Sequence, residues 1–251
     1  MNVNSGQSED RDIRFLHELG ARIAAADPLH SVLALAVDFV SAVVKCDSCF
    51  IYVADGQELI LRASKNPHSD VVDRLKLRVG QGITGWVAEN RTPVAIPYDA
   101  MLDARFQAFN ELPEDRYEAF LSVPMLCREK LVGVINVQHR EPHVYGDREV
   151  RLVSTIGFLI GPEIEMARAD ADNARSMELS EAKRLVEDAK IVLLRDLGFK
   201  EADADAALQR YARENRKSMK DIAEAILLAD DFKRACEPAP RERSATADAG
   251  G

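Results

Sequence analysis

A cluster of basic residues towards the end of the chain has the composition of a phosphate-binding surface. The stretch 207–220 carries a net charge of +4, whereas the whole chain of 251 residues carries −9. The cations of this stretch are Arg210, Arg213, Arg216, Lys217 and Lys220. Cations along one edge of a small helical bundle can contact several phosphates of a nucleic acid. From charge alone, an ordinary solvated helix face explains the same pattern, and both interpretations stay open.

Duplex DNA is a poor partner for this stretch. A helix-turn-helix motif presents basic or polar side chains of its last helix to the major groove. The acidic residues of the last helical pattern here would repel phosphates, and they are Asp221, Glu224, Asp230 and Asp231. The ring of Tyr211 can stack on a base, but its spacing from Ala204 and Leu208 predicts a place in the bundle core.

A glycine-rich segment over Gly80–Gly85 matches the G-x-G-x-x-G pattern of dinucleotide-binding folds. The strand before it alternates, with Lys76 and Arg78 on one face, whereas a central parallel strand is continuously apolar. The helix after it must end before Pro93, which is too soon for a crossover unit. We therefore expect a tight turn between a strand and a short helix, and we assign no cofactor to it.

Cysteine and histidine spacing indicates neither a metal site nor a catalytic centre. Cys46 and Cys49 form a C-x-x-C pair, but no second such pair and no paired histidines complete a zinc site. The five histidines lie in unrelated segments, and no nucleophile stands in a recognisable catalytic motif. We therefore expect no enzyme activity and no metal. Cys49 is predicted to be a small buried apolar residue, while a redox role for the thiol pair stays open.

Composition restricts the class of protein. No run approaches the roughly 18 apolar residues that a membrane span needs, and the polar N-terminus lacks the apolar stretch of a secretory signal. Four cysteines are too few for a disulfide framework. The chain is therefore expected to be soluble and cytoplasmic, with no membrane partner.

The hydrophobic patterns predict an α+β domain with a largely antiparallel sheet, because two hairpins follow two helical segments. The hairpin signals are Asp55-Gly56 and the charged turn Arg128–Lys130. The predicted strands are 48–54, 58–63, 75–79, 119–126 and 131–137.

Only helical patterns follow residue 147. The segment Ala167–Ala182 is rich in alanine and charge, which is typical of an exposed connector or of a helix paired with its copy in a coiled coil. Three further helices are predicted over about 181–197, 201–214 and 218–233. The resulting division is a disordered N-terminus over 1–11, the α+β domain over 12–165, a helical connector over 166–182, an all-α three-helix bundle over 183–234 and a disordered tail over 235–251.

Residues 12–165 resemble a GAF domain. The resemblance rests on motifs in the family's order, namely Asp47–Val53, Leu59–Ala63, Gly80–Val87, Pro93–Ile96, Ser122–Pro124 and Gly133–Val137. The family implies a sheet flanked by helices, a pocket for a small molecule or another signal, and dimerisation through terminal helices. By that analogy the pocket residues are Cys49, Ile51, Trp86, Phe109, Phe120, Ser122 and Asn136. Core packing also explains each of them, and the resemblance names no ligand.

Residues 183–234 resemble an ANTAR domain, the three-helix RNA-binding module of bacterial antitermination regulators. The matching pieces are Ala189-Lys190, Gly198, Ala204, Leu208, Arg210–Ala212, Asp221–Ala223 and Ile226, and Ile191 stands where the family usually has glycine. The family implies binding to paired stem-loops in nascent RNA, which prevents a terminator from forming. The RNA-binding residues that this resemblance and the charge pattern indicate are Lys190, Arg210, Arg213, Arg216, Lys217 and Lys220.

The two resemblances together predict a signal-responsive transcription antiterminator that works as a homodimer. Its partners would be RNA stem-loops, a second copy of the chain and a possible small-molecule effector of the GAF domain. The alternative is a ligand- or redox-sensing GAF module that binds proteins and not RNA. A thiol-based reductase is the third interpretation.

Overall fold

The computed structural model describes residues 3–25, 28–65, 71–106 and 116–236. The chain divides into two units, Met1–Asp170 and Ala171–Gly251, and each is described by itself. Within the described ranges, no helix is both long enough and apolar enough to cross a membrane.

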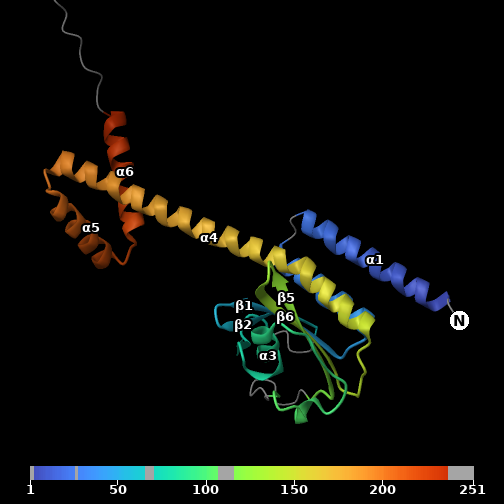
Figure 1. Ribbon diagram of the computed structural model, residues 1–251. Coiled ribbons are helices and arrows are strands. Elements are labelled where there is room, and N and C mark those ends of the chain that lie inside the picture. The colour runs from blue at the N-terminus through green and yellow to red at the C-terminus, as the bar shows by residue number, and fades with distance from the viewer. Residues whose placement is uncertain (1–2, 26–27, 66–70, 107–115, 237–251) are drawn as a thin grey trace, which may run out of the picture. The chain divides into compact units, whose positions relative to one another are not determined.

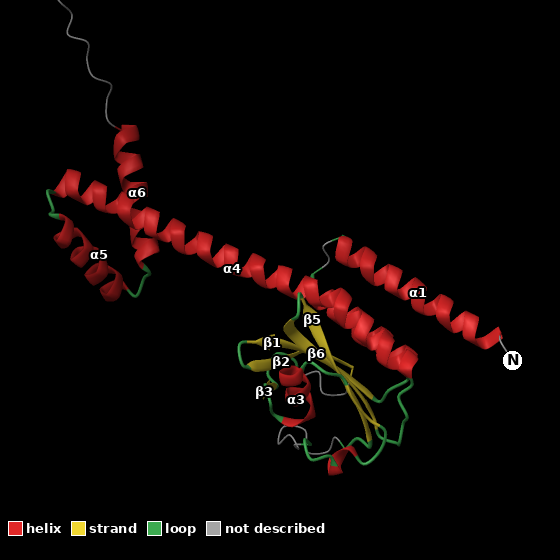
Figure 2. Cartoon of the chain, in the orientation of Figure 1, coloured by secondary structure: helices red, strands yellow, loops and turns green. Residues whose placement is uncertain are grey.

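The first unit is built on a six-stranded antiparallel sheet with the strand order β3-β2-β1-β6-β5-β4 (Figure 2). Its strands are β1 Ser48–Asp55, β2 Glu58–Lys65, β3 Lys76–Arg78, β4 Val94–Ile96, β5 Ala119–Cys127 and β6 Lys130–His139. The predicted hairpins are present, since β1 pairs with β2 around Gly56 and β5 pairs with β6 around Arg128 and Glu129. The expected α+β fold with an antiparallel sheet is confirmed.

Both faces of the sheet are covered, and each covering layer encloses its own core (Figure 1). Helix α2 (Leu29–Val44) packs on one face together with α1 (Val3–Ala24) and the first part of α4 (Asp147–Leu197). The short helix α3 (Gly82–Asn90) and a brief 3-10 turn, η2 (Ala100–Leu102), lie on the other. Side chains of a strand alternate between faces, so neighbours in β1 belong to different cores.

Helix α1 corrects the prediction of a disordered N-terminus over 1–11, because it begins at Val3. The apolar side chains of Phe15 and Leu19 fasten it, and Phe15 stacks on Phe39 of α2. The buried carboxylate of Asp12 accepts a hydrogen bond from Arg148 of α4 at 2.6 Å. This anchoring explains the order of residues 10–24. Residues 1–2 of the predicted disordered segment lie outside the described ranges.

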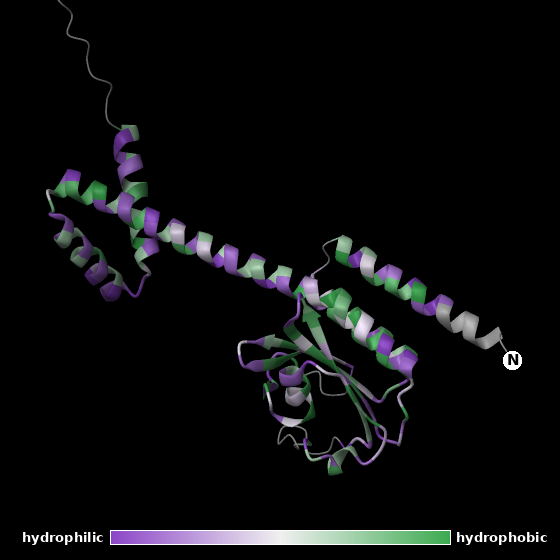
Figure 3. Cartoon of the chain, viewed as in Figure 1, coloured by the Kyte–Doolittle hydropathy of each residue, from purple (hydrophilic) through white to green (hydrophobic). Residues whose placement is uncertain are grey.

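The second unit contains the end of α4, α5 (Glu201–Asn215) and α6 (Met219–Cys236). Its buried core is small and centres on Leu208, Ala212 and Ile222. Helix α4 runs without interruption from Asp147, so the predicted connector and the helix after it form a single helix. In Figure 3 the part of α4 beside the sheet carries a block of hydrophobic residues, and farther along the helix hydrophilic and hydrophobic residues alternate. Of the predicted disordered tail, 235–236 belong to α6 and 237–251 lie outside the described ranges.

Candidate functional site

The five cations at the junction of α5 and α6 form the basic edge, defined as Arg210, Arg213, Arg216, Lys217 and Lys220. The first four are exposed, and Lys220 is half-buried with Glu224 3.9 Å from its ammonium group. None of the first four forms a salt bridge within the described residues. The basic edge therefore presents four unneutralised charges to solvent.

The C-terminus of α5 lies within the basic edge and is closed by backbone hydrogen bonds. Arg216 adopts a left-handed backbone (φ 53°), and the N–H of Lys217 donates to the carbonyl of Ala212 at 3.0 Å. This is the pattern of a helix C-terminus closed by a left-handed residue. The next helix opens with a reciprocal cap, in which Ser218 N–H donates to Asp221 and Asp221 N–H donates to Ser218 Oγ at 2.9 and 3.1 Å. The backbone hydrogen bond from Ser218 lowers the pKa of the Asp221 carboxyl, so this cap is ionised at neutral pH.

Lys190 does not lie on the basic edge. It is only 9% exposed, and its ammonium group contacts Glu187 at 2.7 Å and Asp205 of α5 at 2.6 Å. The hydrogen bonds that the ammonium group donates to Asp205 and Glu187 raise the pKa of Lys190. Its charge is already neutralised, and the residue joins α4 to α5. The role of Lys190 in RNA binding stays a prediction, and the structure places this residue apart from the basic edge.

Tyr211 lies at the surface rather than in the bundle core. Its spacing predicted a core position, but the side chain is 56% exposed, whereas Ala204, Leu208 and Ala212 are buried. The buried face of α5 is therefore narrower than the spacing predicted. An aromatic ring is thus available at the surface next to Arg210.

An ionic clamp joins the end of α4 to α6, and sequence reasoning missed it. Asp230 is 5% exposed, accepts a hydrogen bond from Arg195 of α4 and forms a salt bridge with Arg234 at 2.8 Å. Asp196 contacts Lys233 at 2.9 Å, and hydrogen bonds from Arg195 and Lys233 lower the pKa of Asp196. The clamp holds α6 against α4. The two pairs that join α4 to α6, Arg195 with Asp230 and Asp196 with Lys233, are each more than 30 residues apart in sequence, so no local signal revealed them.

On the sheet, a buried polar chain connects β5, β6 and α3. Ser122 Oγ donates to Asn136 Oδ1 at 2.8 Å, and Asn136 Nδ2 donates to Thr84 Oγ1 at 2.7 Å. All three side chains are buried. Ser122 and Asn136 were predicted pocket residues, and Thr84 was not singled out. This chain fixes α3 on its face of the sheet, because each buried polar group needs a partner.

The predicted pocket residues divide between the two faces of the sheet. Phe120 and Trp86 belong to the core under α3, where the guanidinium of Arg105 stacks over the Trp86 ring at 4.8 Å. Cys49 and Ile51 belong to the core under α1, α2 and α4. The sequence-based grouping of all these residues into one pocket is therefore wrong for Cys49 and Ile51. Phe109 lies outside the described residues.

The thiol pair is poorly placed for redox chemistry. Cys49 is fully buried, as predicted, and burial raises the pKa of its thiol well above the ordinary value. Burial also raises the pKa of Cys46, which is partly buried. Because the thiolate is the reactive form, both thiols are disfavoured as redox centres at neutral pH.

The Gly80–Gly85 segment forms a tight turn between β3 and α3. Gly80 and Gly82 have positive φ angles of 84° and 66°, and Gly80 N–H donates to the carbonyl of Gly85 at 2.8 Å. A Cβ at Gly85 would overlap the carbonyl oxygen of Arg78. The glycines are therefore explained by the turn, and β3 is a three-residue antiparallel strand at the sheet edge rather than a central parallel strand.

Comparison with known proteins identifies a domain family in each of the two units. A GAF domain is matched over residues 28–164, and an ANTAR domain is matched over residues 178–227. The chain is similar to the phosphoenolpyruvate-dependent phosphotransferase system protein of Salmonella typhimurium, with 29% identity over 161 residues. This match covers 62% of this chain and 21% of that protein. The Nif-specific regulatory protein of Herbaspirillum seropedicae is 30% identical over 114 residues, covering 43% of this chain and 20% of the relative. The chain thus spans about a fifth of the length of these curated relatives.

Among solved structures, the GAF domain of a phosphoenolpyruvate-protein phosphotransferase from Coxiella burnetii is 28% identical. The TM-score is 0.59, and the match covers 64% of this chain and 96% of that domain. These relatives concern the first unit alone.

Proposed function

Because the chain belongs to the GAF family and carries an ANTAR domain after its GAF domain, we propose that it is a regulator in which a signal at the GAF domain controls RNA binding by the ANTAR domain. We further propose that it acts by binding rather than by catalysis. The RNA would be a stem-loop in a nascent transcript, and binding would prevent a terminator from forming.

The observation that carries this proposal is the basic edge. Arg210, Arg213, Arg216 and Lys217 are exposed at the end of α5, and they stand out because the chain as a whole is acidic. Phosphate contacts supply most of the nonspecific affinity for a nucleic acid. On an acidic protein, a local cationic surface favours binding of a polyanion at that surface over nonspecific binding to the rest of the protein.

RNA suits this surface better than duplex DNA. Helix α6, which a helix-turn-helix protein would place in the major groove, exposes Asp221, Glu224 and Asp231. Sequence-specific recognition of RNA usually targets unpaired loop bases, which stack on aromatic rings. The exposed ring of Tyr211 beside Arg210 fits that mode of recognition.

For the signal, we propose that the face of the sheet under α3 is the responsive one. Its buried polar chain of Thr84, Asn136 and Ser122 lies within an otherwise apolar core. A ligand that competes for these hydrogen bonds would move α3. The raised thiol pKa values of Cys46 and Cys49 argue against oxidation as the signal.

For transmission, we propose that the continuous helix α4 carries the change, since it contributes to the core of the GAF unit and to the ANTAR bundle. In a homodimer, two ANTAR domains would engage two hairpins of one RNA. The second contact would then be intramolecular, which can raise avidity by about 10²–10⁴.

A salt titration with one RNA hairpin tests the basic edge. The full chain and the Arg213→Gln/Lys217→Gln variant would be titrated with the hairpin at several salt concentrations. We expect the variant to bind about tenfold or more weakly, and the slope of log affinity against log salt to fall by about 1–2. The matched control is Lys183→Gln/Arg184→Gln, which removes two exposed cations of α4 in the same unit. Equal losses in both variants would contradict a defined RNA surface at the end of α5.

A further inference from the structure

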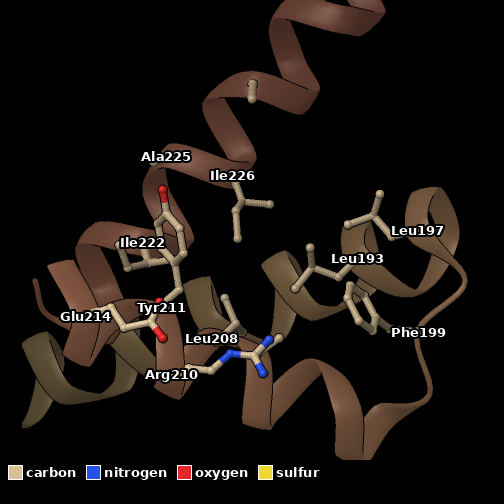
Figure 4. A pocket seen from close by; sticks show the side chains of 12 residues that line it. Leu193, Leu197, Phe199, Leu208, Arg210, Tyr211, Glu214, Ile222, Ala225 and Ile226 are labelled. Carbon is tan, nitrogen blue, oxygen red and sulfur yellow. The ribbon is translucent and has the colours of Figure 1, made fainter.

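The ANTAR bundle has an open apolar groove with a volume of about 480 Å³ (Figure 4). In Figure 4, Leu193, Leu197 and Phe199 line one side of the groove, and Ile222 and Ile226 face them from the other. Such a groove is unusual in the middle of a small bundle, where close packing is the rule. It leaves the unit with a core too small to cover its own apolar residues.

The groove is hollow because its walls carry alanine at three positions, Ala207 on α5 and Ala225 and Ala229 on α6. A larger apolar side chain at any of these positions would fill the space from within. The small residues instead leave room for a side chain that comes from outside, as the holes of helix–helix interfaces do.

The same unit exposes the side chains that such a hollow would accept. Leu228 and Phe232 are each 71% exposed and lie one turn apart on α6. Residues three and four apart share a helix face, so Leu228 and Phe232 continue the face of Ala225 and Ala229. We call Leu228 and Phe232 the α6 ridge. A ridge and a hollow therefore lie next to each other on one surface.

The charges at the groove favour a protein occupant over RNA. Its charged lining residues are Arg210 and Glu214, one of each sign, and neither forms a salt bridge within the described residues. Opposite charges on one patch can pair across a two-fold axis, where each copy offers what the other lacks. A phosphate backbone would meet an uncompensated carboxylate in the same place. Arg213, Arg216 and Lys217, by contrast, do not line the groove.

We propose that the groove is a two-fold interface with a second copy of this chain, in which the α6 ridge of each copy fills the hollow of the other. This inference rests on the proposed function in one respect, the need for a dimer with two ANTAR domains. The proposed interface of that dimer lies on the ANTAR bundle itself. Apart from Arg210 and Tyr211 at its rim, its residues have no role in the RNA proposal. Arg213, Arg216 and Lys217 of each copy stay outside the interface in such a dimer, one set for each hairpin, whereas Arg210 belongs to the interface.

A photo-crosslinking experiment on the full chain tests this interface. The photoreactive residue p-benzoylphenylalanine would replace Phe232, an exposed position where the change does not disturb the core. The labelled chain would be mixed with an isotopically heavy copy, irradiated, and digested for mass spectrometry. We expect cross-links between light and heavy chains that map to the groove residues of α5 and α6.

Filling the hollow provides the second variant. Ala225→Arg should lower the intermolecular cross-link by about tenfold or more, the equivalent of about 1.4 kcal/mol. Ile191→Arg changes an exposed apolar residue of α4 in the same unit, outside both the groove and the connector, and should leave the cross-link unchanged. Cross-links within one chain only, cross-links to the GAF domain only, or no cross-link at all would overturn the proposal. An interchain cross-link that a single RNA hairpin displaces would also overturn it, since the groove would then be an RNA site.

The same samples separate this proposal from the RNA proposal. Selective binding to a two-hairpin RNA without groove cross-links would overturn the interface alone. Groove cross-links in a chain that binds no RNA would support the interface and contradict the RNA function.

Discussion

Arg216 occupies a left-handed backbone conformation (φ 53°) that glycine adopts without steric cost. Arg216→Gly should therefore leave the free energy of unfolding unchanged or raise it by up to about 1 kcal/mol, while it removes one cation of the basic edge. Affinity for an RNA hairpin should fall at the same time. Urea unfolding followed by far-UV circular dichroism, together with an RNA titration, measures both quantities.

A matched control exists in the GAF unit, where Lys45 ends α2 with the same left-handed conformation (φ 56°). Lys45→Gly should have a similar effect on stability and none on RNA affinity. If Arg216→Gly bound RNA as tightly as the unchanged chain, Arg216 would not belong to the RNA surface.

His139 at the end of β6 predicts a pH dependence of stability. Its ring stacks on His143 at 4.0 Å between centroids and contacts the hydroxyl of Tyr145 at 3.1 Å. Burial, aided by the nearby His143, lowers the pKa of His139 below its ordinary value of 6.5, although Asp47 and Glu149 act in the opposite direction. Between the folded and unfolded pKa values the unfolded state binds more protons, so stability falls as the pH drops below about 6.5.

The pH effect can be measured by urea unfolding between about pH 7.5 and about pH 5, followed through the fluorescence of Trp86, the only tryptophan of the chain. The loss of stability should be smaller in His139→Gln than in the unchanged chain. His17→Gln alters an exposed histidine and should leave the profile unchanged. Identical profiles for all three chains would show that His139 is not the responsible group.

At single positions, the sequence indicated which residues are candidates for binding, but it did not indicate which neighbours surround them. The cations of the basic edge were identified from composition, and all of them except Lys220 are exposed. Lys190 could not be distinguished from them, since its partner Asp205 lies on another helix. Cys49 and Ile51 were assigned to the pocket by the resemblance to GAF domains, and the local sequence does not tell which layer of helices covers their face of β1.

At the scale of elements, the clamp between α4 and α6 holds the small bundle together. Asp230 is 5% exposed, and its main partner, Arg195, comes from α4. Asp230→Asn removes a buried charge that two arginines share. Since both arginines are partly exposed, we expect a loss of about 1–3 kcal/mol from the stability of the bundle rather than the larger value for a fully buried pair.

Two probes localise this effect. Far-UV circular dichroism reports on the helices of both units, whereas Trp86 fluorescence reports on the GAF unit alone. Asp230→Asn should shift the unfolding transition that far-UV circular dichroism reports and leave the transition that Trp86 fluorescence reports in place. The control Asp231→Asn changes the neighbouring exposed carboxylate and should cost less than about 0.5 kcal/mol. Equal effects of the two substitutions would show that the clamp does not stabilise the bundle.

Periodicity and turn residues were sufficient to predict the hairpins and most helices, because these depend on local sequence. The helical pattern from Asp147 to Leu197 is continuous in the sequence, with Gly161 and Pro162 as the expected place of a kink. In the structure, a Cβ at Gly161 would approach the carbonyl oxygen of Leu126 to 2.6 Å, so glycine is needed for α4 to lie against β5. The part of α1 before Ile13 was missed, and the contact of Asp12 with Arg148 of α4 joins residues too far apart in sequence to be predicted.

At the scale of the whole molecule, charge is divided between the two domains. Residues 1–182 carry a net charge of −9, while residues 183–234, which include the basic edge, carry +1. An acidic sensor domain repels RNA, which confines the polyanion to one surface of the chain. A dimer doubles that surface without any new contact to each hairpin.

The most direct test of this account compares RNAs with one hairpin and with two hairpins in titrations of the full chain. A dimeric antiterminator should bind the two-hairpin RNA more tightly by a factor within about 10²–10⁴, because the second contact is intramolecular. The Arg213→Gln/Lys217→Gln variant should lose that preference. Equal affinity for both RNAs and for duplex DNA of the same length, unaffected by this variant, would contradict the account.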